Sequence, residues 1–397
     1  MADVAGRMLG LDLLRAVAAW LVLLSHVAFW TGAGASGVVG GLAVRGELGV
    51  AIFFALSAFL LSSPFVRRAL GGTADWSTRR YLVRRAARIL PAYLLALAAV
   101  VAVAARLGGA AASVLDVPTV LVHLVIGQGW TGRTFQSFTQ TWSLTTEVTF
   151  YLLLPLVAWL LAPLVRGASP TAATRRLLWL CLLVGVLGLG TQTFAALLEG
   201  TPGGVLATSA AGHAAWFALG VAVRVLVEAE RVDALPADRP WLEVLRTSPG
   251  TLVVLAAVLW LLASTPVAGP RAIESSSPPE ALAAEVLYGL VAGCLLLAAT
   301  TRGLSSTLAD SPVAGALRWL GDISYGVFLW HVLVLQVAFA ALDLRLFAAP
   351  FALTLALATL VSVGLAHLSW MLLERPVLAL AHRRPADAPE PLPAPRG

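Results

Sequence analysis

Long apolar stretches dominate the chain, and most of them are about as long as a helix that crosses a bilayer. A hydrocarbon core of about 30 Å requires about 20 mostly apolar residues in an α-helix. The sequence therefore predicts an all-α polytopic membrane protein with about ten transmembrane helices. The ten predicted spans are Leu9–Trp30, Glu47–Ser63, Arg88–Ala105, Ser143–Val165, Arg175–Leu198, Val205–Val227, Gly250–Val267, Glu280–Thr300, Leu317–Leu342 and Phe351–Glu374.

The composition excludes most other classes of protein. Hydrophobic residues make up 59% of the 397 residues and charged residues only 12%, whereas a soluble domain carries about 25% charged residues. A soluble domain, a disordered chain, a disulfide scaffold and a nucleic-acid-binding domain are therefore all disfavoured. The apolar stretches also lack the two-residue alternation of a membrane β-barrel. A shorter apolar stretch, Val117–Ile126, is too brief to cross and is expected to be a re-entrant or interfacial helix.

The distribution of arginine indicates the orientation of the spans. All 27 basic residues are arginines, and cytoplasmic loops collect positive charge. With the N-terminus inside, the outer loops contain only Arg45, Arg106, Arg133, Arg271 and Arg345. Both termini are therefore expected in the cytoplasm. We expect the membrane to be the inner (plasma) membrane of a bacterium. We expect one transmembrane domain over residues 1–384 and a disordered, Pro/Ala-rich cytoplasmic tail over residues 385–397.

The first span carries charged and titratable groups, which are costly in hydrocarbon unless they are paired or hydrated. Arg15 and His26 are eleven positions apart, which places them on one helix face and about 16 Å apart along the axis. Arg15 either extends to the inner interface or pairs with Asp12, one turn earlier, or has a functional role. His26 lies in the apolar outer half of this helix, where a functional role is favoured over a purely structural hydrogen bond to a neighbour.

A second polar group follows Trp142 at the start of the fourth predicted span. Ser143 and Glu147 could simply begin a helix, because a serine cap and an acidic first turn stabilise any helix start. However, Glu147 is about five residues below the outer boundary, and His26 is four residues from the outer end of its own span. The similar depth predicts that Glu147 pairs with His26, since a carboxylate fixes the tautomer of an imidazole that acts as a general base.

Two further groups of polar residues occur, one at the cytoplasmic side and one in the ninth predicted span, where His331 lies near or past the middle of the membrane. Arg84, Arg85 and Arg88 follow Arg79 and Arg80 at a predicted helix start; they either set topology and attract anionic lipid or form a clamp for phosphate. Tyr325 and His331 either pack between helices through hydrogen bonds or line the cavity of His26. We interpret Cys181 and Cys294 as packed apolar residues and expect no metal site.

These segments together resemble the membrane acyltransferase family 3, a family of bacterial multi-spanning O-acyltransferases. The resemblance covers residues 11–376 and rests on motifs that occur in order. The motifs are Leu11-Asp12-x-Leu14-Arg15 followed by His26, Gly49–Leu60, Arg84-Arg85-x-x-Arg88-Ile89-x-Pro91-x-Tyr93, Trp142-Ser143-Leu144-x-x-Glu147-x-x-Phe150-Tyr151, Gly321-x-Ile323-Ser324-Tyr325 followed by Leu329 and His331, and Glu374-Arg375-Pro376.

The resemblance implies transfer of an acyl group, most often acetyl, from cytosolic acyl-CoA to a hydroxyl of an outward-facing acceptor. We expect this acceptor to be a cell-envelope glycolipid or glycan; a macrolide-type small molecule is an alternative. No nucleic acid is expected as a partner.

A mechanism follows from the resemblance and the residues together. Arg15, Arg84, Arg85 and Arg88 would bind the CoA phosphates. His26, oriented by Glu147, would act as the general base, with Asp12 and Trp142 as supporting polar groups. Tyr325, His331 or Ser143 would stabilise the oxyanion. Transient acylation of His26 itself is an open alternative.

Two other classes of protein compete with this interpretation. In a proton-coupled transporter or flippase of an envelope precursor, the buried Arg, His and Glu would form a proton relay. Such transporters usually show paired halves and interrupted helices, and neither is apparent in this sequence. A purely structural membrane protein leaves the similar depth of His26 and Glu147 unexplained.

Overall fold

A computed structural model describes residues 8–73, 76–106, 115–235, 247–271 and 274–382. These residues form helices and loops, and no strand occurs among them. The all-α architecture of the prediction is therefore confirmed. The tail predicted over residues 385–397 lies outside the described residues.

A helix occupies each of the ten predicted spans. These helices are α1 (Leu9–Thr31), α3 (Gly49–Leu61), α5 (Thr78–Ala104), α8 (Trp142–Val165), α9 (Pro170–Ala195), α11 (Ala214–Arg231), α13 (Pro249–Ala263), α14 (Pro278–Ala299), α16 (Ala314–Ala341) and α17 (Phe351–Ser369). Eight helical segments of the described residues are long and apolar enough to cross a membrane. The other two helices are α11, whose inner end is charged, and α13, which is only 15 residues long.

Short helices connect and cap the long ones. They are η1 (Ala33–Ala35), α2 (Gly37–Val44), η2 (Arg45–Leu48), α4 (Ser63–Ala69), α6 (Val117–Leu124), α7 (Gln128–Thr131), η4 (Gln136–Thr141), α10 (Gly200–Ala207), η5 (Pro266–Ala268), α15 (Arg302–Ala309), the π-helical turn η6 (Trp370–Glu374) and α18 (Arg375–His382). The stretch predicted to be too short to cross is the eight-residue helix α6.

Two of the predicted helix starts differ from the structure by nine or ten residues, more than any of the others. Helix α5 begins ten residues before the predicted Arg88, because the side chain of Ser77 caps it by accepting a hydrogen bond from the backbone of Arg80. Its arginines therefore lie on a continuous helix rather than in a loop. Helix α11 begins at Ala214 rather than at Val205, because a turn between the end of α10 and His213 interrupts the helix.

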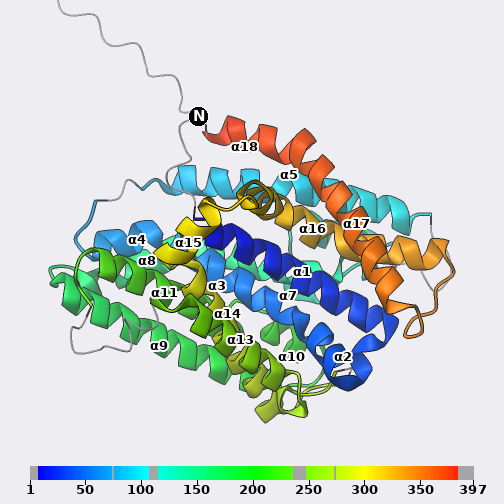
Figure 1. The fold of residues 1–397 in the computed structure, drawn as a ribbon, viewed down its shortest axis with the longest axis horizontal. Helices are drawn as coiled ribbons and strands as arrows, with labels where there is room; N and C mark the ends of the chain where they lie inside the picture. Colours follow the sequence, from blue (N-terminus) through cyan, green and yellow to red (C-terminus); the bar gives the residue numbers. More distant parts are fainter. Residues whose placement is uncertain (1–7, 74–75, 107–114, 236–246, 272–273, 383–397) are drawn as a thin grey trace, which may run out of the picture.

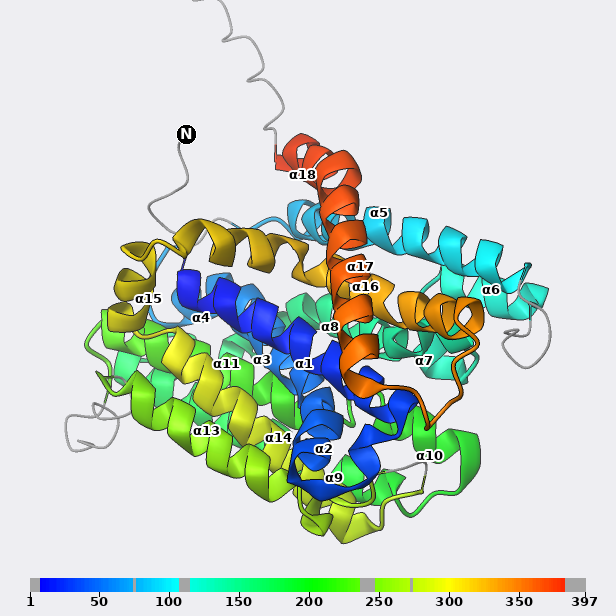
Figure 2. The ribbon, with the colours of Figure 1, turned by 45° about the vertical axis from the view of Figure 1, so that its right-hand side comes forward.

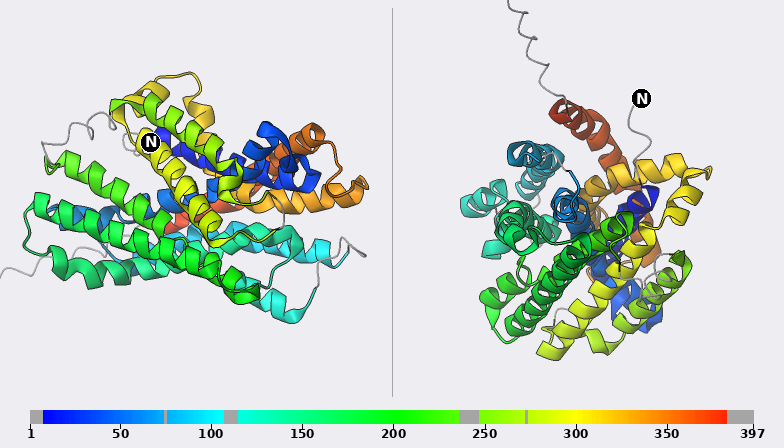
Figure 3. Two further views of the ribbon diagram at one scale, coloured as in Figure 1. Left: turned by 90° about the horizontal axis from the view of Figure 1, so that it is seen from below. Right: turned by 90° about the vertical axis from the view of Figure 1, so that its left-hand side faces the viewer.

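Helices α1 and α16 form the centre of the molecule. In Figures 1 and 2, α5, α17 and α18 lie on one side of this pair, and α9, α11, α13 and α14 lie on the other. In the most apolar 18-residue stretch of α16, 78% of the residues are buried, whereas in that of α9 only 11% are buried. Helices α8 and α9 lie side by side (Figure 3) and expose leucine, valine and tryptophan side chains, as expected for a lipid-facing surface.

The close approach of α1 and α16 depends on Gly321. A Cβ atom at this position would lie 2.8 Å from Cβ of Asp12 and 3.0 Å from its Cα. Asp12 is fully buried and accepts a 2.8 Å hydrogen bond from Arg15. The absence of a side chain at Gly321 therefore allows the two helices to approach each other where Asp12 positions Arg15.

Replacing Gly321 by alanine is expected to destabilise the protein. The added methyl group must push α1 from α16, and overpacking of this kind costs about 1–3 kcal/mol. Gly315→Ala on the same helix is the matched control, because nothing lies within 4 Å of the Cβ added there. Thermal unfolding in detergent should show a lower Tm for Gly321→Ala and an unchanged or slightly raised Tm for Gly315→Ala. Equal Tm values for the two variants would contradict the proposed contact.

Candidate active site

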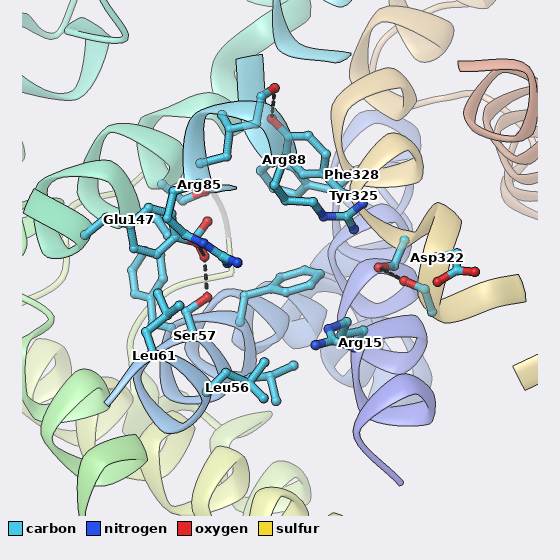
Figure 4. A pocket seen from close by; sticks show the side chains of 18 of the residues that line it. Arg15, Leu56, Ser57, Leu61, Arg85, Arg88, Glu147, Asp322, Tyr325 and Phe328 are labelled. Carbon is cyan, nitrogen blue, oxygen red and sulfur yellow. Dashed lines mark hydrogen bonds between the residues drawn. The ribbon is translucent and has the colours of Figure 1, made fainter. Parts of the chain in front are cut away.

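A cavity of about 500 Å³ on the side of the molecule predicted to be cytoplasmic is lined by four arginines (Figure 4). We call it the inner cavity. Arg15 comes from α1, and Arg84, Arg85 and Arg88 come from the first three turns of α5. The structure thus brings together all four arginines that the sequence predicted to bind phosphate. The remaining polar lining comes from three other helices: Ser57 from α3, Ser143, Glu147 and Tyr151 from α8, and Asp322, Ser324 and Tyr325 from α16.

Two of these arginines have fixed partners. Arg15 pairs with Asp12 at 2.8 Å, and Arg88 pairs with the buried Glu374 at 3.4 Å. The guanidinium of Arg88 also lies over the rings of Tyr325 and Trp370, 5.6 and 5.5 Å from their centroids. These contacts hold both cations at the cavity wall.

Arg84 and Arg85 differ, because Nε of each is buried without a hydrogen-bond partner in the described part of the chain. A buried N–H group without a partner is costly. A guanidinium also matches the geometry of phosphate oxygens. The inner cavity therefore suits an anion that carries several phosphate groups.

Glu147 lies in this inner cavity and is not paired with His26, so the predicted pairing is wrong. Its Oε1 accepts hydrogen bonds from the hydroxyls of Ser57 and Tyr151, the latter at 2.5 Å. Figure 4 shows Arg85 beside it. Neither Ser57 nor Tyr151 was predicted as a site residue, although both lie within the motifs of the resemblance.

The predicted pairing of Glu147 with His26 is wrong because the depth of Glu147 was counted from Ser143 as the start of the span. The apolar span begins at Gln136, not at Ser143, because η4 is already packed within the bundle. Gln140 donates a 2.9 Å hydrogen bond to the carbonyl of Leu329, close in sequence to His331. Glu147 follows Gln140 by seven residues, which places it about 10 Å further along the helix, towards the inner end.

A second cavity, of about 750 Å³, lies on the opposite side of the molecule and contains His26. We call it the outer cavity. Trp142, Gln140, His213, Glu47 and Glu285 also line it. The two cavities share the lining residues Val50 and Phe328, and the ring of Phe53 meets Phe328 edge-on at 6.0 Å between centroids. We infer that the two cavities adjoin at these three apolar side chains, which we call the constriction.

Hydrogen bonds fix the tautomers of the central histidines. Nδ1 of His26 lies 2.9 Å from the carbonyl of Val22, and Nδ1 of His331 lies 3.1 Å from that of Val327. Because a carbonyl can only accept, each Nδ1 carries the proton. Nε2 of His331 lies 3.3 Å from Nδ1 of His26 and accepts from it. Nε2 of His26 therefore keeps a lone pair, and no described residue hydrogen-bonds to it.

The predicted oxyanion donors are divided between these environments. Only His331 contacts His26. Tyr325 and Ser143 line the inner cavity, where Tyr325 donates to the carbonyl of Ile89 at 3.2 Å and Ser143 to that of Gln140 at 3.1 Å. The expectation that Tyr325 or Ser143 assists at His26 is therefore wrong, because both hydroxyls donate to backbone carbonyls away from that ring.

Sequence reasoning also missed residues of the outer cavity. His213 lies 3.1 Å from Oε2 of Glu285, and Glu47 accepts a 2.6 Å hydrogen bond from Tyr288. Glu285 did carry a signal, since an acidic residue inside an apolar span points to function by default. No group of three or more His, Cys, Asp or Glu placed to hold a metal occurs in the described ranges.

Comparison with known proteins identifies the family. The acyltransferase 3 family, described as an acyltransferase domain, matches residues 8–369. The chain belongs to this family. This acyltransferase 3 protein is therefore a multi-pass membrane enzyme that transfers acyl groups other than aminoacyl groups. It is 27% identical over 400 residues to nodulation protein 10 of Rhizobium leguminosarum bv. viciae, with 93% of each chain covered. No solved structure matches it.

The tautomer assignment predicts which histidine reacts with diethylpyrocarbonate, a reagent that modifies unprotonated imidazole nitrogens. His26 faces the outer cavity and should be modified. His331 and His123 are fully buried and should be protected. Peptide mass spectrometry of the protein in liposomes, sampled over time, would measure the order. Modification of His331 before His26 would contradict the assignment.

Proposed function

We propose that this acyltransferase moves an acyl group, most commonly acetyl, from cytosolic acyl-CoA to a hydroxyl of a cell-envelope glycolipid or glycan. We place it in the bacterial inner membrane with both termini in the cytoplasm. The observation that carries the proposal is the pair of cavities that meet at Val50 and Phe328, one lined by arginines and the other containing His26. Such an arrangement suits a polyanionic donor on one side and a hydroxyl acceptor on the other.

The donor would enter from the inner cavity. Arg84 and Arg85, with their unpartnered Nε groups, would bind the phosphates of CoA, and Arg15 and Arg88 would complete the clamp. The pantetheine arm would pass the constriction and span the distance of about 16 Å along α1 between Arg15 and His26. Glu147 would position Arg85 rather than act on the acceptor.

The chemical step requires one base and one bond exchange. Nε2 of His26 takes the proton of the acceptor hydroxyl as its oxygen attacks the thioester carbon. The new C–O bond forms, the C–S bond breaks, and the proton passes from His26 to the leaving thiolate of CoA. The carbonyl of Val22 and Nε2 of His331 both accept from Nδ1 of His26 and so stabilise the imidazolium during transfer.

Replacing His26 by alanine tests the base. Loss of a general base lowers kcat by about 10²–10⁴-fold. The assay follows transfer from labelled acetyl-CoA to envelope glycolipids and glycans extracted from a deletion strain of the source bacterium. His367→Ala is the matched control, because His367 contacts Trp319 outside both cavities and should keep wild-type turnover.

Two results would overturn the proposal, one from this assay and one from a separate transport assay. One is wild-type turnover by His26→Ala. The other is coupled uptake of an envelope precursor into proteoliposomes without acyl-CoA, which would favour the transporter class instead.

Replacing Arg85 by alanine tests the clamp. A hydrogen bond to a charged group contributes about 1.5–3 kcal/mol, so the KM for acetyl-CoA should rise by about tenfold to a hundredfold. The rise should shrink at high salt, because part of it is electrostatic. Arg79→Ala is the control, since Arg79 is exposed on the same helix and does not line the cavity. An unchanged KM with a lost kcat would argue against phosphate binding by Arg85.

A further inference from the structure

Several hydrogen-bond donors that line the outer cavity already donate to acceptors within the protein. The amide of Gln140 donates to Leu329, that of Gln192 donates to the carbonyl of Ala207 at 3.1 Å, and the indole of Trp216 donates to the carbonyl of Glu285 at 2.8 Å. The hydroxyl of Tyr288 donates to Glu47. Because these donors are engaged, a ligand that binds beside them would mainly find hydrogen-bond acceptor atoms.

His213 and Glu285 form an imidazole–carboxylate couple in this cavity. Nδ1 of His213 lies 3.1 Å from Oε2 of Glu285, and the amide of Gln192 donates to the same oxygen at 3.3 Å. Because a carboxylate accepts, Nδ1 of His213 carries a proton, and in the neutral ring Nε2 keeps a lone pair. No described residue hydrogen-bonds to that Nε2.

Two oxygens of residues that line this cavity, one of them in the couple itself, also lack partners. Oε1 of Glu285 and Oε1 of Gln140 are buried without a hydrogen-bond partner among the described residues. The orientation of the Gln140 amide is fixed, because its nitrogen faces two carbonyls that can only accept. Each unmet oxygen is costly to bury, so the cavity is suited to a ligand that brings several donors.

The charge and the shape of the cavity indicate which class of ligand it can bind. Glu47 and Glu285 line it, and no described arginine does, but Nη1 of the buried Arg45 lies 3.4 Å from Oε1 of Glu47. Glu285 is therefore the lining carboxylate that no arginine of the described residues neutralises. The rings of His213 and Trp216 stack at 4.1 Å between centroids, with Trp142 next to them. A flat, hydroxylated ring can place its C–H face on such aromatic rings while its hydroxyls donate to the oxygens around them.

We propose that the His213–Glu285 couple is the acceptor-binding subsite of this enzyme and that it selects an uncharged sugar ring. One hydroxyl of the sugar donates to His213 Nε2 or Glu285 Oε1, while a different hydroxyl reaches His26 and is acylated. A sugar that carries a carboxylate or phosphate adds acceptors and negative charge where the cavity already has both, so it is rejected. The role of the second hydroxyl rests on the proposed function, but selective binding of the sugar does not.

Binding without acyl-CoA tests the subsite separately from the reaction. The probes are octyl β-glucoside, octyl β-galactoside and octyl β-mannoside, compared with octyl β-glucuronide, which differs from the glucoside by one carboxylate. Radiolabelled probes are titrated into the protein in nanodiscs, and partition into empty nanodiscs is subtracted. At least one uncharged glycoside should bind saturably, about tenfold or more tightly than the glucuronide.

Glu285→Gln provides a change that simple misfolding cannot mimic. Loss of the carboxylate should weaken binding of the uncharged glycoside by about tenfold and strengthen binding of the glucuronide, so the selectivity ratio collapses. Glu199→Gln, an exposed carboxylate outside the cavity, should leave the ratio unchanged. A Tm equal to that of the wild type shows that the variant is folded, and Glu47→Gln provides the same ratio test if it is not.

Several results would overturn the subsite. They are glucuronide binding as tight as that of the best uncharged glycoside, no saturable binding of any uncharged probe, and an unchanged selectivity ratio in Glu285→Gln. Selective binding together with no acyl transfer from acetyl-CoA would instead refute the proposed function and leave the subsite intact.

Discussion

The arrangement of this protein depends on the cost of placing charged groups in hydrocarbon. A charged side chain inside a span must be paired or must face water. The charged side chains near the centre of this bundle meet this condition either by pairing or by facing a cavity. Asp12 is buried against Arg15, and Glu374 against Arg88. Arg84, Arg85 and Glu147 face the inner cavity. The cavities are therefore part of what allows α1, α5 and α8 to carry these residues through a membrane.

Hydropathy predicted the helices but not their places in the bundle. Helices α9 and α16 have the same hydropathy in their most apolar windows, 1.8, yet these windows are 11% and 78% buried. The bilayer and the protein interior are both apolar, so an average over side chains cannot distinguish lipid-facing from central helices. The difference is carried by single residues such as Gly321, whose small size allows α16 to approach α1.

The candidate site was predictable in its members and less so in their pairing. Arg15 and the arginines of α5 could be grouped from the sequence because all lie near the helix ends that are predicted to be cytoplasmic. The pairing of His26 with Glu147 failed because counting residues from a hydropathy boundary misses the buried turns of η4. The couple of His213 with Glu285 joins residues 72 positions apart, and it depends on packing among α9, α11 and α14 that no local pattern reports.

In the proposed reaction, the constriction between the cavities would separate the two substrates by polarity. Val50, Phe53 and Phe328 present no hydrogen-bond partner to a group that passes between them. Desolvation of a phosphate there would be far costlier than desolvation of a thioester, which carries no charge. In the proposed reaction the nucleotide thus stays with the arginines while only the acyl end of the donor reaches His26. An apolar constriction between two polar cavities would in this way let the acyl group cross the membrane core while CoA remains on the cytoplasmic side.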